Sequence, residues 1–294
     1  MISIVICSVN EQLRNNIRDN IAATIGVDFE LLIVSNTNNT GICKVYNDTL
    51  ISTKFNFVCF VHEDVVFHTI NWGKQLEILL SKNDTGLVGV SGTTYKSIYP
   101  APWTCCDKSF YRNNTLQHFN GFENAEISNY FPTGIDFCEV AVLDGVLLAG
   151  RKEIFTRFRF DDMLLNGFHG YDIDISLAVG RKFKLLVTNN ILIEHLSEGK
   201  FNKNWIKDSL VLHKKWKQSL PKSIGNRDKK NTYSDYLACS GFLNLLIING
   251  SSKRVVSNYF FILLTKYSFY NRYKYIKSFF YYLLGHQRLI SKIK

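Results

Sequence analysis

The chain has 294 residues, of which 46% are hydrophobic and 20% are charged. This length allows one large domain or two modest ones, and the composition excludes a disordered or collagen-like chain. The formal net charge is +10, but residues 1–200 carry 17 Lys and Arg against 22 Asp and Glu, whereas residues 201–294 carry 18 against 3. An anionic partner, either a nucleic acid or a membrane surface, is therefore expected for the C-terminal part only.

The cysteines and the N-terminus indicate an intracellular environment. Seven cysteines form an odd set without a Cys-x-x-Cys pair, so neither a disulfide framework nor a zinc ribbon is indicated. Residues 1–7 enter an apolar run without a basic segment before it, which argues against a signal peptide. The longest uncharged stretch near the C-terminus, residues 236–252, contains Asn, Ser and Gly and is too short for a membrane-spanning helix. We expect a cytoplasmic protein.

Apolar runs typical of buried strands alternate with helical stripes in the first part of the chain. The runs are Ile2–Cys7, Phe29–Val34, Phe57–Val61 and Gly86–Val90. Stripes with helical spacing lie between them, at Leu13, Ile17, Ile21 and Ile25, at Ile42, Val45, Tyr46 and Leu50, and at Trp72, Leu76, Leu79 and Leu80. This alternation predicts right-handed βαβ units and a mostly parallel α/β sheet flanked by helices.

The period is lost over residues 91–135, which are rich in Tyr, Trp, Asn and Thr and are predicted to form an insertion or long loop. Regular structure should then return with the elements that follow. These are strands at Phe137–Leu143, Lys184–Thr188 and Ile191–Glu194, and helices starting near Arg151, near Tyr171 and around Trp205–Trp216. A polar break at 221–235 suggests a boundary, so we predict a body at 1–220 and a helical extension at 221–294.

His62-Glu63-Asp64 directly follows the strand-like run Phe57–Val61. Ligands of open α/β sheets bind beyond the carboxyl ends of the strands. Adjacent metal-capable side chains at such a place suit a divalent cation bound to a diphosphate. A charged surface turn explains the same residues equally well.

Asp172 and Asp174 open a predicted helix behind Gly167 and Gly170. Acids in a first helical turn are stabilised by the helix dipole and need no further role. The flanking glycines would let the backbone approach a ligand, which makes a general base the alternative. His195, after the strand Ile191–Glu194, is a third candidate, although a lone histidine is more often structural.

These segments, taken in order, resemble the GT-A family 2 glycosyltransferases, in particular a bacterial glycosyltransferase-like subgroup. The resemblance covers about residues 1–215. It depends on the opening strand through Ser8 and Asn10, the strand end at Asn36, the segment Gly41–Asn47, the His62–Asp64 strand end, Leu143-Asp144-Gly145, and Gly170–Asp174. Each segment alone is weakly specific, whereas the ordered set is much more so.

The resemblance implies a nucleotide-sugar donor and a metal-dependent, inverting transfer that uses Mn²⁺ or Mg²⁺. Asp172 matches the catalytic base, although the acid usually found before it is Tyr171 here. Asp64 matches the second acid of the Asp-x-Asp metal motif, with His62 in place of the first acid and His195 as a late ligand. The remaining positions implied for the nucleotide are Ser8, Asn10, Asn36, Lys44, Asn47 and Glu63, and those for the sugar or acceptor are Trp103, Asp144, Gly145, His169, Gly170 and Tyr171. Trp103 suits a sugar-stacking platform and a buried anchor equally well.

The basic C-terminal part mixes aromatics and leucines with Lys and Arg from Tyr259 onward. This pattern suits helices that lie in a bilayer interface, which would place the enzyme at the cytoplasmic membrane face near a glycan or lipid-linked acceptor. The alternative is a helical subdomain that packs its aromatics on the body. Nucleic-acid binding is not expected, because no recognisable binding motif accompanies the aromatics.

Two other functions remain open at the level of sequence. A nucleotidyltransferase would make the sugar nucleotide, but the chain lacks a Gly-rich, Lys-bearing phosphate loop after its first strand. A non-catalytic sugar-nucleotide or glycan-binding partner of an assembly complex would explain the altered His62 and Tyr171 positions. The donor sugar, the acceptor and the linkage are not determined by these motifs.

Overall fold

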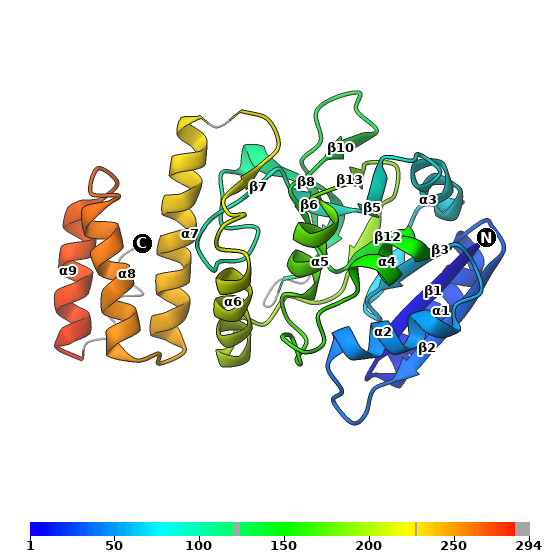
Figure 1. Ribbon diagram of the computed structural model, residues 1–294, viewed down its shortest axis with the longest axis horizontal. Coiled ribbons are helices and arrows are strands. Elements are labelled where there is room, and N and C mark those ends of the chain that lie inside the picture. Colours follow the sequence, from blue (N-terminus) through cyan, green and yellow to red (C-terminus); the bar gives the residue numbers. More distant parts are fainter. Residues whose placement is uncertain (120–123, 227, 286–294) are drawn as a thin grey trace.

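A computed structural model describes residues 1–119, 124–226 and 228–285 (Figure 1). A seven-stranded sheet forms the centre of the body, in the order β10-β13-β5-β12-β3-β1-β2. Five strands run in one direction, and only β12 and β10 run the other way. The strands are β1 (Ile2–Ser8), β2 (Phe29–Ser35), β3 (Phe57–Val61), β5 (Thr85–Gly89), β10 (Phe137–Glu139), β12 (Leu147–Arg151) and β13 (Lys184–Thr188).

Helices cover both faces of this sheet. Buried residues of α1 (Glu11–Thr24) and α3 (Trp72–Leu80) share one hydrophobic cluster, and those of α2 (Ile42–Ser52), α4 (Lys152–Phe158) and α5 (Tyr171–Val179) share another. Alternate residues of β1 divide between the clusters, because successive strand side chains point to opposite faces. The predicted α/β body, a mostly parallel central sheet flanked by helices, is therefore present.

Residues 91–135 differ from the aperiodic loop that their composition predicts. They supply strands β6 (Ser91–Thr93), β7 (Tyr95–Lys96), β8 (Tyr111–Gln117) and β9 (Glu126–Asn129), and a short 3-10 helix at Lys108–Phe110. A second sheet has the order β11-β6-β8-β14-β4, with β9 on β8. Its other strands are β11 (Val142–Leu143), β14 (Ile193–His195) and β4 (Val65–Phe67). β8 reads Tyr-Arg-Asn-Asn-Thr-Leu-Gln, so no apolar alternation reveals it.

Two further sequence predictions need correction. The predicted strand Phe137–Leu143 is two short strands, β10 and β11, that belong to different sheets. The expected helix near Arg151 is α4, but the antiparallel strand β12 that precedes it was not predicted. Its five residues are all apolar or small except the last, and a run that short does not distinguish a strand from a buried helical turn.

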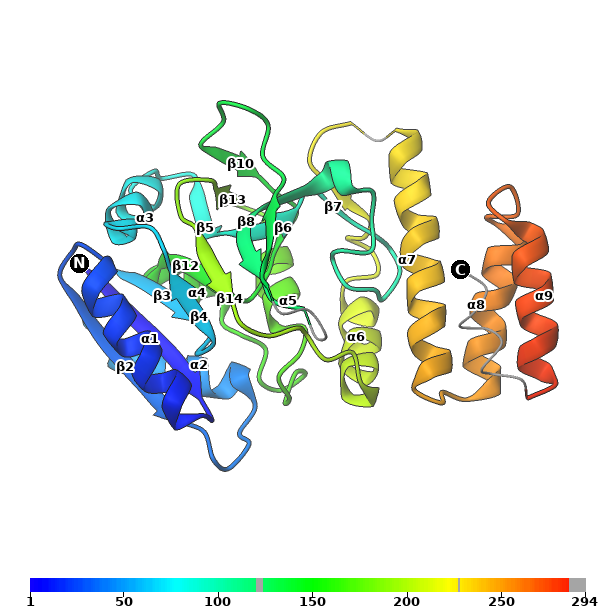
Figure 2. The ribbon, with the colours of Figure 1, turned by 180° about the vertical axis from the view of Figure 1, so that it is seen from behind.

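Residues after α6 (Lys203–Lys215) form β15 (Lys222–Ser223) and three long helices, α7 (Lys229–Ile248), α8 (Lys253–Thr265) and α9 (Arg272–Leu283). Figures 1 and 2 show these helices side by side at the end of the molecule away from β1 and β2, with α9 outermost. None of the described helices is both long enough and apolar enough to span a bilayer. Residues 286–294 of the predicted extension lie outside the described residues.

The aromatics of these helices are mostly packed against one another and against the body. One buried cluster joins Phe242, Phe260 and Tyr267 of the extension to Tyr99 and Ile206 of the body. Tyr95 and Ser97 donate hydrogen bonds to Asp235 of α7, at 2.9 and 2.6 Å. The packing that we considered as an alternative to a membrane role is therefore present for much of the extension.

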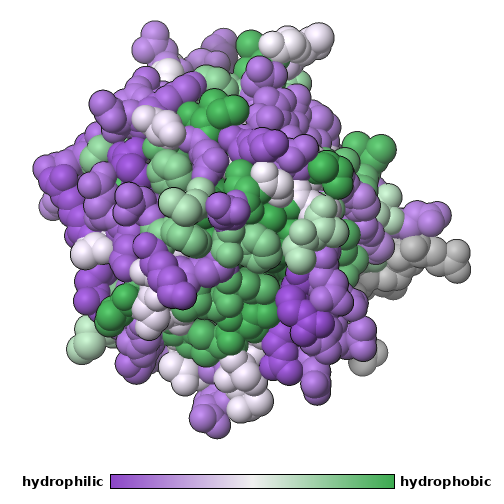
Figure 3. Space-filling model, turned by 90° about the vertical axis from the view of Figure 1, so that its right-hand side faces the viewer, coloured by the Kyte–Doolittle hydropathy of each residue, from purple (hydrophilic) through white to green (hydrophobic). Residues whose placement is uncertain are grey.

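At the opposite end, β2 is the edge strand of the large sheet. Figure 3 views this end and shows apolar residues gathered in the middle of the face, over β2, with hydrophilic residues around them. The side chains from Phe29 to Val34 are half-buried, and several of them pack against the two body clusters.

Candidate functional site

The pairing of β14 with β4 creates a group of three metal-capable side chains. Val65 follows Asp64 and lies opposite His195 in this pairing, while His62 and Asp64 leave the end of β3 together. Nε2 of His195 lies 3.5 Å from Oδ2 of Asp64, and Nδ1 of His62 lies 3.9 Å from Oδ1. The three ligand atoms are all within 4.8 Å of one another, so the group could hold a metal ion. The histidines that the sequence suggested thus lie with Asp64.

The electrostatics of the group suit a cation. Burial would raise the pKa of Asp64, but the nearby His195, the charge of His62 and the Ser197 hydroxyl together lower it. Burial would lower the pKa of His195, but Asp64 outweighs it and raises that pKa. Nε2 of His195 is buried and has no hydrogen-bond partner among the described residues. A carboxylate held ionised beside an unpartnered imidazole nitrogen is a fitting ligand set for a divalent cation.

Two residues that sequence reasoning missed hold this group. The Ser197 hydroxyl donates a 2.5 Å hydrogen bond to Oδ2 of Asp64. Oε1 of Gln117, at the end of β8, lies 3.1 Å from Nδ1 of His195. Nothing in the sequence marked Gln117, because β8 itself was not predicted.

His62 is joined to the first residue of α5. Its Nε2 lies 2.8 Å from the Tyr171 hydroxyl, which also bonds to the carbonyl oxygen of Gly145 at 3.2 Å. A side chain at position 145 would overlap the Tyr171 hydroxyl, so this close approach requires glycine. Burial, followed by the neighbouring His195, lowers the pKa of His62.

Asp172 lies next to this chain of contacts. The Gly145 backbone N–H donates a 3.2 Å hydrogen bond to Oδ2 of Asp172. Burial, and then the charge of Asp144, raise the pKa of Asp172 to about 7 in spite of that bond. A carboxylate with such a pKa can accept a proton near neutral pH, as a general base must.

Asp144 anchors an aromatic wall. Its Oδ1 accepts a 2.8 Å hydrogen bond from the Val146 backbone, and its Oδ2 accepts one of 2.7 Å from the Trp103 indole nitrogen. The Trp103 ring meets Tyr111 edge-on, and Tyr111 meets Tyr130 in the same way, with centroids 5.6 and 5.3 Å apart. Trp103 is half-buried and hydrogen-bonded to Asp144, and a role as a sugar-stacking platform stays a prediction. The two tyrosines were not predicted as site residues.

His169 and Gly170 lie just before Asp172. Gly170 has φ +78° and begins α5, a conformation that favours glycine. His169 is half-buried, and burial lowers its pKa against the charge of Asp208. Asp174 does not face this site. It is buried in a bond to Trp216, 2.7 Å, and an ion pair with Lys215, 2.8 Å, which fix α5 to α6.

The predicted nucleotide residues at the end of β1 are connected to one another by hydrogen bonds. The Glu63 carboxylate accepts hydrogen bonds from the backbone N–H groups of Val9 and Asn10, at 3.1–3.2 Å. The Asn10 side chain accepts from Leu13 N and caps α1, and Ser8 is buried with its hydroxyl 3.4 Å from Asn10 O. The metal-motif segment is thus tied to the first strand–helix turn.

Three other predicted nucleotide residues are already engaged within the scaffold. Asn36 is buried and bonds to both the N–H and the carbonyl oxygen of Thr40, at 2.9 and 2.7 Å. Asn47 is buried and bonds to both backbone groups of Phe160, at 2.8 and 3.2 Å. Lys44 is exposed and paired with Asp48 at 2.8 Å. These contacts account for the first two side chains structurally, and their contact with a nucleotide stays a prediction.

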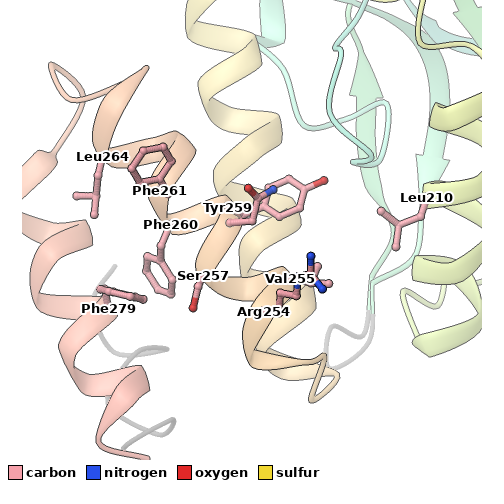
Figure 4. Close-up of a pocket in the computed structure, with 10 residues that line it drawn as sticks. Leu210, Arg254, Val255, Ser257, Tyr259, Phe260, Phe261, Leu264 and Phe279 are labelled. Carbon is pink, nitrogen blue, oxygen red and sulfur yellow. The ribbon is translucent and has the colours of Figure 1, made fainter.

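A cavity of about 770 Å³ lies away from these residues, between α6, α8 and α9 (Figure 4). Its lining includes Leu210, Arg254, Phe261 and Phe279 and none of the predicted site residues. This cavity is therefore separate from the candidate site, which we describe by the contacts between the side chains around Asp64 and Asp172.

Comparisons with known proteins were made against families, curated proteins and solved structures. Residues 3–223 match a family described as "Glycosyltransferase like family". No curated protein matches the chain. The chain resembles the crystal structure of GalNAc-T7 with UDP, GalNAc and Mn²⁺, at 13% identity and a TM-score of 0.52, over 84% of this chain and 56% of that one. The chain therefore spans little more than half of that protein.

Two further solved structures are more distant. The mannosyltransferase PcManGT from Pyrobaculum calidifontis, in complex with GDP-Man and Mn²⁺, has 13% identity and a TM-score of 0.47, over 93% of this chain and 84% of that one. S. aureus TarS 1–349 with UDP-GlcNAc has 13% identity and a TM-score of 0.45, over 84% and 72%. The family match and the likeness to the first structure confirm the resemblance and the fold class predicted from the sequence.

Proposed function

Because the chain belongs to the glycosyltransferase-like family and has the GT-A fold, we propose that it transfers a sugar from a UDP-sugar to a glycan or lipid-linked acceptor. The transfer is metal-dependent and inverts the anomeric carbon, and it serves surface polysaccharide synthesis. One observation carries the proposal: Asp172 is joined through Gly145 and Tyr171 to the metal-capable group around Asp64. These contacts support placing the proposed base close to the proposed site of the leaving diphosphate.

His62, Asp64 and His195 would hold the cation. Mn²⁺ or Mg²⁺ bound there neutralises the charge that develops on the departing diphosphate. Imidazole and carboxylate together are a donor set that Mn²⁺ accepts readily, whereas Mg²⁺ favours oxygen ligands. The two histidines therefore favour Mn²⁺. The GalNAc-T7 structure, which was solved with UDP, GalNAc and Mn²⁺, agrees with this choice.

Asp172 acts as the base. It takes the proton of the acceptor hydroxyl while that oxygen attacks the anomeric carbon from the face opposite the diphosphate. A single displacement of this kind needs one base, whereas glycosidases need two carboxylates. In this proposal the sugar and the acceptor are oriented by Trp103, Asp144, Gly145, His169, Gly170 and Tyr171.

Ser8, Asn10, Asn36, Lys44, Asn47 and Glu63 form the nucleotide side of the proposal. Ser8 is the last residue of β1, and Asn10 and Asn36 lie beyond the carboxyl ends of β1 and β2, where ligands of such sheets bind. Since the side chains of Asn36 and Asn47 are occupied within the scaffold, they shape this part of the site and leave contact with the nucleotide to their backbone and neighbours.

Release of nucleoside diphosphate from a panel of UDP- and GDP-sugars, with and without Mn²⁺ and in the presence of candidate acceptors, tests this function. We expect Mn²⁺-dependent release that falls by about 10²–10⁴ in Asp172→Asn. Donor binding without turnover across the acceptor panel would instead support the non-catalytic binding partner that the sequence left open.

The C-terminal extension supports a peripheral position at a membrane. The outermost helix α9 has a packed face, with Tyr275 and Tyr282 buried. It also carries an exposed apolar stripe with helical spacing, formed by Tyr273, Ile276, Phe280, Leu283 and Leu284, which are 37–80% exposed. We call this set the α9 stripe.

Charge complements the α9 stripe. Lys274 and Lys277 lie on the same helix, and residues 236–285 contain no Asp or Glu. Exposed aromatic and aliphatic residues beside lysines are typical of helices that lie in an anionic bilayer interface. We propose that the α9 stripe contacts the cytoplasmic membrane face, where a lipid-linked acceptor would reside.

A further inference from the structure

The hydrogen bonds around the metal-capable group determine where its imidazole protons lie. The Tyr171 hydroxyl has one proton, and the Gly145 carbonyl oxygen can only accept. The contacts at 3.2 Å to Gly145 and 2.8 Å to His62 Nε2 are both satisfied only when the hydroxyl donates to Gly145 and His62 Nε2–H donates to the hydroxyl. The opposite assignment leaves that carbonyl without its bond and turns a His62 Nδ1–H toward Asp64 at 3.9 Å, too far for a hydrogen bond.

Gln117 determines the position of the proton on the His195 ring in the same way. Its amide nitrogen donates to the carbonyl oxygens of Ser197 and His118, at 2.7 and 2.9 Å, so its Oε1 is the atom that faces His195. An amide oxygen only accepts, and His195 Nδ1 must therefore carry the proton of the 3.1 Å bond. His195 Nε2 is left with its lone pair, and it is the buried nitrogen without a partner beside Asp64.

As a result of the bonds to Tyr171 and Gln117, the unprotonated nitrogens of both neutral histidines, His62 Nδ1 and His195 Nε2, face the carboxylate of Asp64. With both rings neutral, the two lone pairs and the carboxylate repel one another unless a metal ion lies between them, and in its absence a proton on His195 is favoured by the same carboxylate. Partners of this kind, which set the tautomer and orientation of a ligating histidine, typically change metal affinity by about 10–100-fold when removed.

We propose that Tyr171 and Gln117 are positioning residues that fix the tautomers of His62 and His195 for metal binding. This proposal rests on the proposed metal-dependent function. It adds that the residue immediately before the base Asp172 orients a ligand of the metal, through a hydroxyl that a phenylalanine would lack. The start of α5 thereby fixes the base and the ligand His62 relative to each other.

Two measurements on the full chain test the proposal. In the metal-free protein at pH 8, long-range ¹H–¹⁵N spectra of labelled histidines report each tautomer, and His62→Gln assigns the His62 signals. We expect Nε2–H in the wild type and a mixture with Nδ1–H in Tyr171→Phe. Titration with Mn²⁺ alone, followed by electron paramagnetic resonance, should show affinity about 10–100-fold weaker in Tyr171→Phe and Gln117→Leu.

Tyr275→Phe is the matched control, because it also removes a buried tyrosine hydroxyl with two hydrogen bonds, but in the extension. It should leave the tautomers and the Mn²⁺ affinity unchanged. A His62 tautomer that is unchanged in Tyr171→Phe overturns the proposal, whether Mn²⁺ affinity falls or not. Absence of Mn²⁺ binding in the wild type would instead contradict the proposed function, and the tautomer measurement does not depend on that result.

Discussion

The indole nitrogen of Trp103 donates a 2.7 Å hydrogen bond to the carboxylate of Asp144, 41 residues away in the chain. Asp144 is in turn a charge that raises the pKa of Asp172. The aromatic wall contributed by residues 91–135 is therefore electrostatically connected to the proposed base.

Trp103→Phe keeps an aromatic ring but removes the donor to Asp144. A hydrogen bond to a charged group contributes about 1.5–3 kcal/mol, so kcat/KM should fall at least about 10-fold. The uncompensated Asp144 charge should also raise the pKa of Asp172, which moves the acid limb of the pH profile upward. Steady-state kinetics from pH 5 to 9 measure both effects. An unchanged profile would contradict the electrostatic link.

Asp172→Asn preserves the size of the side chain and removes the base. Turnover should drop by about 10²–10⁴, the usual scale of acid–base catalysis, whereas donor binding should persist. Mass spectrometry of the product and calorimetry of donor binding check the two parts. Near-normal transfer by this variant would reject Asp172 as the base.

The raised pKa of Asp172 gives two pH dependences of defined sign. Because the base must be ionised, kcat/KM should rise with pH through about 7. The folded protein also binds the Asp172 proton more tightly than the unfolded chain, so this group destabilises the fold as pH rises from the ordinary Asp range through 7.

The thermal stability of Asp172→Asn tests the second dependence. A pKa raised from 3.8 to about 7 makes this variant more stable than the wild type by up to about 4 kcal/mol at pH 8 and equal to it near pH 4. Thermal melts without donor or metal at the two pH values provide the measurement. Equal stability at pH 8 would show that Asp172 is not destabilised by its surroundings.

Asp64→Ala removes the carboxylate shared by both histidines. Mn²⁺-dependent donor binding should weaken by at least about 10-fold, whereas Asp84→Ala, which breaks an exposed pair with Lys184, should have no effect. Calorimetry with and without Mn²⁺ makes the comparison. Unchanged affinity in Asp64→Ala would exclude its role as a ligand.

The α9 stripe can be tested by flotation of the full chain with anionic vesicles. Tyr273→Ser, Phe280→Ser and Leu284→Ser combined should lower the bound fraction by more than about 10-fold, because each side chain loses its apolar transfer energy. The matched control replaces Ile51, Ile70 and Ile78, which are 60–76% exposed on the body. Equal losses in the two variants would contradict the assignment of this face to the membrane.

The sequence was sufficient for the parts of the fold that alternate in hydrophobicity. β1, β2 and β3 are continuous apolar runs, and the residues that follow β3 were recognisable as metal-capable because they break such a run abruptly. A strand was predicted at Ile191–Glu194, close to the observed β14, but β8 was not predicted, since polar residues dominate it. Their pairing is what brings Gln117 to His195, so that contact could not be predicted.

The contacts that individual side chains make could not be predicted from the sequence either. Asn36 and Asn47 look like ligand-binding residues at strand and helix ends, yet their amides close backbone hydrogen bonds within the scaffold. Asp174 looks like a companion of Asp172, yet a separation of two residues, about half a helical turn, places the two on different sides of α5, with Asp174 paired to Lys215. Spacing indicates a candidate, whereas orientation depends on tertiary neighbours.

The hydrogen bonds between α7 and the segment around Tyr95 and Ser97 bear on how this protein can be divided. The same segment is held by the buried Lys96, whose ammonium group donates to Ala101 O at 2.9 Å, and it leads directly to Trp103. Cutting the chain after residue 220 would expose Tyr99 and remove the partner of Ser97. Helix α7 thus supports the segment that leads to Trp103. Exchanging the C-terminal helices between relatives would require exchanging residues 95–103 with them.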